Sequence, residues 1–126
     1  MADEYGHLPR GPRRMLKAAK WSLQGIKAAW LHESSFRLEC YLLVILVPVA
    51  LWLGNDPVER ALMVGCMFLV LAAELLNSAV EAVIGRYGDD FHELAGRAKD
   101  MGSAAVFVLM MNVLVTWGLI LVPRFL

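Results

Sequence analysis

Three long apolar runs, separated by polar segments, dominate the pattern of this chain. A bilayer core of roughly 30 Å needs about 20 residues of helix, and the runs predict membrane-crossing helices at residues 35–54, 58–84 and 101–122. The first run is short and takes in a few polar residues at its start. The pattern therefore predicts an all-α membrane protein with three transmembrane helices, built as a single membrane domain over residues 1–126.

The segment before these runs has a different pattern. Within residues 13–32, apolar side chains recur at helical spacing with basic residues between them. This pattern predicts an amphipathic helix that lies on the membrane surface. An ordinary soluble amphipathic helix is the alternative, and the membrane segments that follow favour the surface position.

Composition and charge agree with this interpretation. The chain is 59% hydrophobic with a mean hydropathy of +0.56, which is too apolar for an ordinary small soluble protein. Its formal net charge is zero, so the charge balance predicts no nucleic-acid partner. The basic residues gather before residue 40 and in the polar link 85–100. The positive-inside rule therefore predicts a cytoplasmic N-terminus, a cytoplasmic link and a C-terminus on the other side.

The second apolar run carries a polar stripe. Glu74, Asn77, Ser78 and Glu81 stand at i, i+3, i+4 and i+7, which aligns them on one helical face. A carboxylate at membrane depth costs roughly 2.5–3.5 kcal/mol and usually has a function. A structural hydrogen bond between helices is the alternative. Two carboxylates near the cytoplasmic surface can share a cation, and Mg²⁺ favours one or two carboxylates together with substrate phosphates.

Two further clusters flank the predicted spans. Glu33 and Glu39 lie just before the apolar run of the first span, which begins at Cys40. Arg37 is placed to pair with Glu33 in an ordinary surface salt bridge, which explains this cluster as well as a functional role does. Lys99 and Asp100 lie at the start of the third span, followed by small residues that allow close backbone approach. The lysine is suited to a phosphate, although an ordinary flanking positive charge is the preferred explanation from this segment alone. The sequence contains no G-x-x-x-x-G-K-[ST] loop, no G-x-G-x-x-G and no protein-kinase motif.

Three segments in this order resemble the bacterial integral-membrane diacylglycerol kinase family: "KAAWLHESSFRLE", "ELLNSAVEAV" and "HELAGRAKDMGSAAV". The resemblance implies a homotrimer of three-span subunits in the bacterial cytoplasmic membrane, with a periplasmic C-terminus and active sites at subunit interfaces. It implies transfer of the γ-phosphoryl group of magnesium-ATP to the primary hydroxyl of diacylglycerol, giving phosphatidic acid. The implied partners are ATP, diacylglycerol, membrane lipid and other copies of the chain.

The resemblance also implies roles for individual residues. Glu74 corresponds to the general base, Glu33 and Glu81 to the carboxylates that hold Mg²⁺, and the wider catalytic set is Glu74, Asn77, Lys99 and Asp100. The implied ATP-binding residues are Arg14, Trp21, Ser22, Glu33, Glu81, His92, Gly96, Lys99 and Asp100. The implied lipid-side residues are Glu39, Glu74 and Ser103. Gly85 and Trp21 depart from the family pattern, in which an acid and a tyrosine are expected.

Two other functions remain open from the sequence. A kinase of the same fold that acts on undecaprenol would share most of these motifs. A non-catalytic ion-conducting bundle, with Glu74 as its ion site, would need neither the lysine nor the acids outside the membrane.

Overall fold

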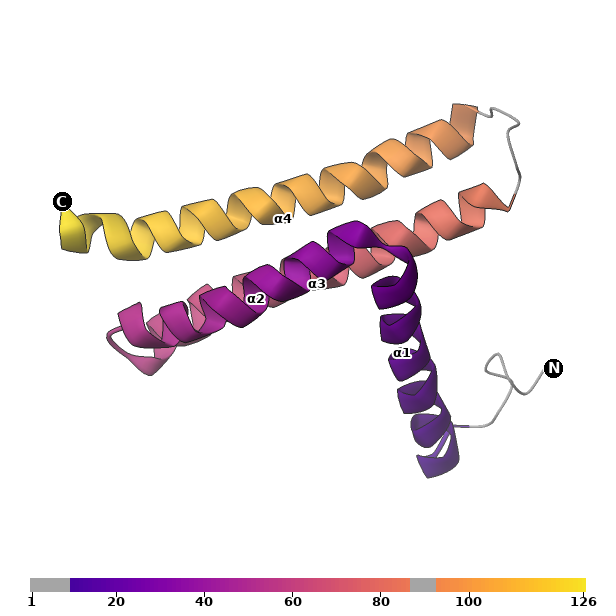
Figure 1. Ribbon diagram of the computed structural model, residues 1–126, viewed down its shortest axis with the longest axis horizontal. Coiled ribbons are helices and arrows are strands. Elements are labelled where there is room, and N and C mark those ends of the chain that lie inside the picture. The colour runs from indigo at the N-terminus through magenta and orange to yellow at the C-terminus, as the bar shows by residue number, and fades with distance from the viewer. Residues whose placement is uncertain (1–9, 87–92) are drawn as a thin grey trace.

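The computed structural model describes residues 10–86 and 93–126, and this part of the chain forms four α-helices (Figure 1). Their bounds are Pro12–His32 (α1), Ser34–Leu53 (α2), Pro57–Gly85 (α3) and Glu93–Phe125 (α4). Helices α2, α3 and α4 run lengthwise through the molecule, and α1 leaves them at a steep angle. The start of α2, the end of α3 and the start of α4 therefore lie toward one end of the molecule, together with α1.

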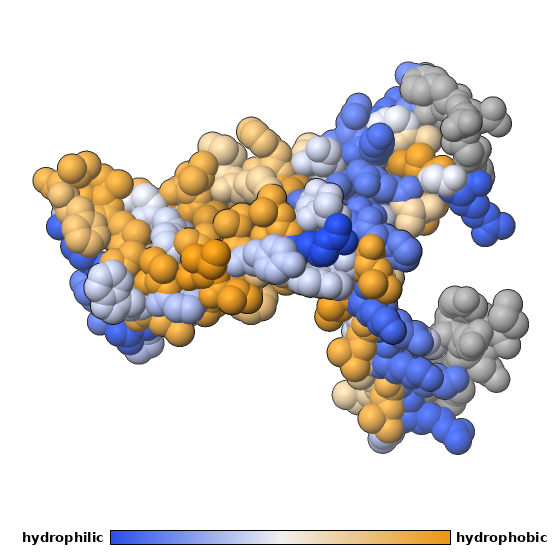
Figure 2. Space-filling view, viewed as in Figure 1, coloured by the Kyte–Doolittle hydropathy of each residue, from blue (hydrophilic) through white to orange (hydrophobic). Residues whose placement is uncertain are grey.

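Helix α3 is the central element, since it packs against both α2 and α4. Its buried residues recur at helical spacing and are Met63, Cys66, Met67, Val70, Ala73 and Glu74. Trp117 on α4 donates its Nε1–H to the carbonyl oxygen of Met63 over 3.1 Å, which ties α4 to the second turn of α3. Apolar side chains cover most of the visible bundle surface, and polar ones concentrate toward the end that carries α1 (Figure 2).

Three of the helices, α2, α3 and α4, are long and apolar enough to cross a membrane. The fold is therefore all-helical, as the apolar pattern predicted. One boundary differs from the sequence-based interpretation: α4 begins at Glu93, so residues 93–100 of the predicted polar link are helical. Their polarity marks a helix that extends beyond its apolar run, because polarity alone does not break a helix and the segment 93–100 contains no proline.

The tight connections are built from local hydrogen bonds. Asp56 caps α3 by accepting a hydrogen bond from the Glu59 N–H over 2.8 Å, and Pro57 occupies the first turn, where its missing N–H costs nothing. A single extended residue, Glu33, separates α1 from α2. Arg37 closes this junction by donating Nη1–H to the carbonyl oxygens of Trp30 at 2.6 Å and Leu31 at 3.4 Å.

A polar network joins the helices at the opposite end. Arg124, in the last turn of α4, forms an ion pair of 2.7 Å with Glu59 and donates to the Leu53 carbonyl oxygen. With its amide oriented so that the oxygen faces Arg124, Asn55 accepts from Nη2 over 2.8 Å. Arg60 donates Nε–H to the Leu51 carbonyl oxygen over 3.1 Å. The network anchors the end of α4 to the α2–α3 turn.

Candidate active site

Glu74 is the centre of the candidate site. The residue is 7% exposed, and it is the one buried charged residue among residues 10–86 and 93–126. The carboxylates of Glu39, Glu81 and Glu33 all lie within electrostatic range of it. The fold thus gathers four acids from the α1–α2 junction, α2 and α3. Such a concentration of like charge is unfavourable unless a cation or a proton compensates it.

The α1–α2 junction explains how Glu33 comes to face this region. Glu33 occupies the N-cap position of α2, yet its side chain makes no capping hydrogen bond. The suggested Glu33–Arg37 salt bridge does not form, because Arg37 turns back onto the carbonyl oxygens at the end of α1. The Glu33 carboxylate therefore faces the space between α1 and α3 without an ion pair to Arg37.

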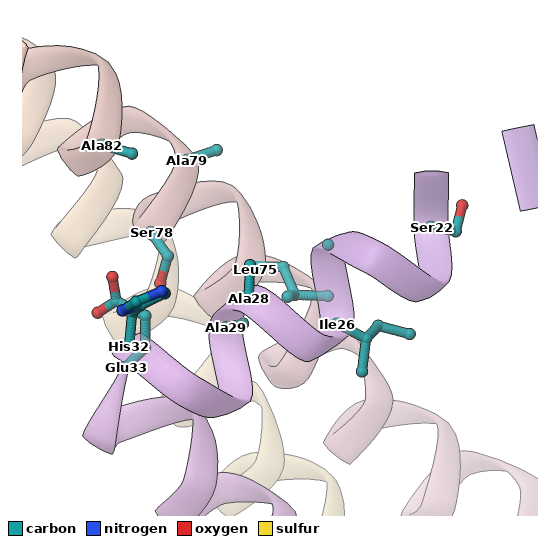
Figure 3. Close-up of a pocket in the computed structure, with 11 residues that line it drawn as sticks. Ser22, Ile26, Ala28, Ala29, His32, Glu33, Leu75, Ser78, Ala79 and Ala82 are labelled. Carbon is teal, nitrogen blue, oxygen red and sulfur yellow. The ribbon is translucent and has the colours of Figure 1, made fainter. Parts of the chain in front are cut away.

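That space is a cleft of about 580 Å³ between α1 and α3 (Figure 3). Ser22, His32 and Glu33 line it from the α1 side, and Ser78 lines it from α3. Much of the remaining wall is small, with Gly25, Ala28, Ala29, Ala79 and Ala82. In Figure 3 the side chains of His32, Glu33 and Ser78 point toward the same part of the cleft. No role was expected for His32 from the sequence. Its position directly before Glu33 in the chain was the one feature that could have indicated its place in the cleft.

Asn77 and Glu81 are partners on the next turn of α3. The Asn77 Nδ2–H donates to Glu81 Oε1 at 3.5 Å, a long contact. The Asn77 Oδ1 atom is buried and has no hydrogen-bond partner in the described part of the chain. Gly102 on α4 lies directly against this carboxamide. The expected close approach of α4 at these small residues is therefore observed, and it occurs at the polar stripe of α3.

A second hollow runs between α2 and α4 and has a volume of about 320 Å³. Glu39 is its one charged lining residue, and the others are Leu42, Leu43, Leu46, Met67, Val70, Met110, Val113 and Leu114. An adjacent hollow continues along Val113, Leu114 and Trp117 toward Val122. The two hollows form an apolar groove along the bundle. The groove includes Glu39, whose carboxylate lies within electrostatic range of Glu74.

The acids suit a metal that is held jointly with a ligand. No group of three or more His, Cys, Asp or Glu side chains able to hold a metal occurs within residues 10–86 and 93–126. The donors present are carboxylate and amide oxygens, which match the preference of Mg²⁺ for hard ligands. One or two protein carboxylates with phosphate oxygens make up a usual magnesium site. The residues therefore fit Mg²⁺ when phosphates supply the remaining ligands.

The other predicted site residues lie further out. Arg14 and Trp21 are half-buried on α1, and Ser22 donates its Oγ–H to the Ala18 carbonyl oxygen over 2.9 Å. Lys99, Asp100 and Ser103 are exposed on α4, and Gly96 is half-buried there. Within the described ranges, no hydrogen bond or ion pair links Lys99 or Asp100 to the acids around Glu74. His92 lies outside the described residues.

These features define a class: a small all-helical protein with three potential membrane spans and a cluster of carboxylates toward one end. The profile of prokaryotic diacylglycerol kinase matches residues 20–121. The chain belongs to this family.

Curated relatives cover almost the same length. The diacylglycerol kinase of Haemophilus influenzae is 49% identical over 111 residues, which cover 88% of this chain and 94% of the relative. That of Escherichia coli K12 is 44% identical over 115 residues, covering 91% and 94%. That of Pseudomonas aeruginosa is 47% identical over 111 residues, covering 88% and 90%.

Proposed function

We propose that the protein is an ATP-dependent lipid kinase of the bacterial cytoplasmic membrane that converts diacylglycerol to phosphatidic acid. Family membership supplies the reaction class. The observation that carries the proposal is the burial of Glu74 among three other carboxylates, of which Glu33 lines the α1–α3 cleft and Glu39 lines the apolar groove. A kinase that joins a water-soluble nucleotide to a lipid hydroxyl needs both surfaces.

In this proposal Glu74 is the general base. It accepts the proton of the lipid primary hydroxyl while the hydroxyl oxygen bonds to the γ-phosphorus of ATP and the bond to the β–γ bridging oxygen breaks, releasing ADP. Phosphoryl transfer depends mainly on positioning and charge stabilisation. A base within hydrogen-bond reach contributes typically about 10²–10⁴-fold. The burial of Glu74 supports a proton transfer that is shielded from water.

The cleft between α1 and α3 is the proposed ATP side. Glu33 and Glu81 would hold Mg²⁺ together with the ATP phosphates, and the bound ion would neutralise charge that develops during transfer. Asn77 would orient Glu81 through its Nδ2–H. The remaining ATP contacts are proposed from the family pattern and are Arg14, Trp21, Ser22, His92, Gly96, Lys99 and Asp100. The cleft lining by Ser22 and Glu33 supports their shared role.

The groove between α2 and α4 is the proposed lipid side. Its apolar lining suits acyl chains, and Glu39 places a polar group where the lipid hydroxyl would approach Glu74. Ser103 is proposed on the same side. We further propose that α1 is an amphipathic helix on the cytoplasmic surface and that three copies assemble into a homotrimer. Large apolar side chains exposed along α2 and α4, such as Val44, Ile45, Leu114 and Leu119, support burial by lipid or by other copies.

One assay tests the function. Transfer of labelled γ-phosphate from magnesium-ATP is measured in mixed micelles, with diacylglycerol and undecaprenol side by side and Glu74→Gln as the control. Label on diacylglycerol that is lost in the variant supports the proposal. Label mainly on undecaprenol would keep the reaction and change the substrate. A folded protein that labels neither lipid would contradict the kinase function and favour the ion-conducting bundle.

A further inference from the structure

The contact between Gly102 on α4 and Asn77 on α3 leaves no room for a side chain at position 102 unless the Asn77 carboxamide moves. A Cβ atom built on Gly102 would lie 2.5 Å from Asn77 Oδ1, 3.4 Å from Asn77 Cγ and 3.8 Å from Asn77 Cα. Real Cβ atoms essentially never approach another heavy atom to within 3.0 Å. The carboxamide oxygen therefore occupies the space that a side chain at position 102 would need.

The same oxygen is buried without a hydrogen-bond partner in the described residues. Buried carbonyl oxygens are almost always paired, so an exception requires an explanation. The nitrogen of the same carboxamide explains the exception, because Nδ2 faces Glu81 Oε1 at 3.5 Å. Rotating the group to give the oxygen a donor would turn the NH₂ away from Glu81.

We propose that Gly102 is a positioning residue of the phosphoryl-transfer site. Its bare backbone lets the Asn77 oxygen lie flat against α4, and this contact keeps the Asn77 NH₂ directed at the Glu81 carboxylate. The effect on catalysis rests on the proposed function, in which Glu81 holds the metal with the ATP phosphates. The geometric part, an Asn77 orientation set by Gly102, does not depend on that function.

The contact geometry shows what an added methyl group would disturb. The atom closest to it is the end of the Asn77 side chain, which can rotate about its own bonds. The distance to the Asn77 Cα is an ordinary van der Waals contact, so the α3 and α4 backbones need not separate. Alanine also favours a helix more than glycine does. Gly102→Ala is therefore expected to turn the carboxamide while leaving the helices packed.

The kinetic test compares Gly102→Ala with Gly118→Ala and Gly65→Ala. Gly118 is on the same helix, Gly65 is on α3, and a Cβ at either meets nothing within 4 Å. Gly102→Ala is expected to lower kcat by about a hundredfold, the cost of a displacement near 1 Å in a reacting group. It should also raise the Mg²⁺ concentration for half-maximal rate, with the KM for diacylglycerol unchanged. Wild-type kcat in Gly102→Ala, or an equal loss in both controls, would overturn the proposal.

A second readout does not use activity. The side-chain amide resonances of Asn77 in the full-length ¹⁵N-labelled protein are assigned by their loss in Asn77→Ala. They are expected to shift in Gly102→Ala and to stay in place in Gly118→Ala. Unshifted resonances would refute the contact. If the wild type is inactive but the resonances shift, the kinase function fails and the contact stands.

The folding outcome is also informative. If Gly102→Ala does not fold, the clash with Asn77 must be the reason, since the nearest atoms all belong to that residue. The double variant Asn77→Ala/Gly102→Ala must then recover the folded protein, measured by size-exclusion chromatography and thermal unfolding. A double variant that also fails to fold would overturn the proposal.

Discussion

The guanidinium of Arg124 lies 2.7 Å from the carboxylate of Glu59, although the two residues are 65 positions apart in the chain. The pair joins the last turn of α4 to the first turn of α3. Arg124 also donates to the Leu53 carbonyl oxygen, so one side chain links three helices. The pair lies toward the opposite end of the molecule from α1 and the α1–α3 cleft (Figure 1).

Arg124→Gln is expected to weaken this anchor without affecting the site. A glutamine cannot form the ion pair, and a carbonyl oxygen that loses a charged donor loses one of the stronger kinds of hydrogen bond. We expect the midpoint of thermal unfolding in detergent to fall by a few degrees while kcat and both KM values stay at the wild-type level. Arg13→Gln, an exposed change on α1, is the control. A fall in kcat at unchanged stability would show that the two ends are coupled.

Glu74→Gln separates chemistry from binding. The amide is close in size to the carboxylate but cannot accept the hydroxyl proton. We expect kcat to fall by about 10²–10⁴-fold, the usual contribution of a general base. ATP affinity, measured by equilibrium titration, should change little, because the ATP cleft is lined by other residues. Glu59→Gln serves as a control carboxylate. A Glu74→Gln protein with near-wild-type turnover would exclude Glu74 as the base.

Glu33→Gln and Glu81→Gln test the proposed metal ligands. Each removes a negative charge that Mg²⁺ would share with the ATP phosphates. The Mg²⁺ concentration for half-maximal rate should rise by about tenfold or more, since even residues that only support a metal ligand cost roughly 10–100-fold in affinity when mutated. The measurement is a magnesium titration at saturating ATP, with Glu59→Gln beside it. An unchanged titration curve for both variants would remove these two residues from the metal site.

Much of the fold could be predicted because it follows from local pattern. The apolar runs are long, and helical spacing alone aligned Glu74, Asn77 and Glu81 on α3. The start of α4 at Glu93 could not be predicted in the same way, because polar residues that continue a helix resemble a polar loop. Neither the composition nor the hydrophobic periodicity distinguishes a polar helical extension from a polar loop when no proline or capping motif marks the boundary.

The site required contacts between residues far apart in the chain. Sequence spacing placed Glu33 near Arg37, and the salt bridge offered as one alternative does not form because Arg37 donates instead to carbonyl oxygens at the end of α1. The presence of Ser78 and His32 in one cleft depends on the angle between α1 and α3, which no local pattern encodes. The small residues at 102 and 103 predicted a close approach, but not that Asn77 would be the group approached.

Arg37 bridges the junction at which α1 turns away from α2. Its Nη1 atom lies 2.6 Å from the Trp30 carbonyl oxygen and 3.4 Å from that of Leu31, so one guanidinium satisfies two carbonyl groups at the end of α1. Arg37→Ala would leave both groups without this donor and let α1 swing away from α3. A hydrogen bond to a charged group contributes about 1.5 kcal/mol or more, which corresponds to roughly a tenfold rise in the KM for ATP if the cleft must re-form on binding.

The kcat of Arg37→Ala at saturating ATP should stay near the wild-type value, because Glu74 is held by α3 and not by α1. Lys20→Ala, which removes an exposed positive charge from the same helix, is the matched control. An equal rise in the KM for ATP in both variants would mean that ATP binding depends on the net charge of α1. A rise confined to Arg37→Ala would identify the α1–α2 junction as the element that shapes the nucleotide cleft.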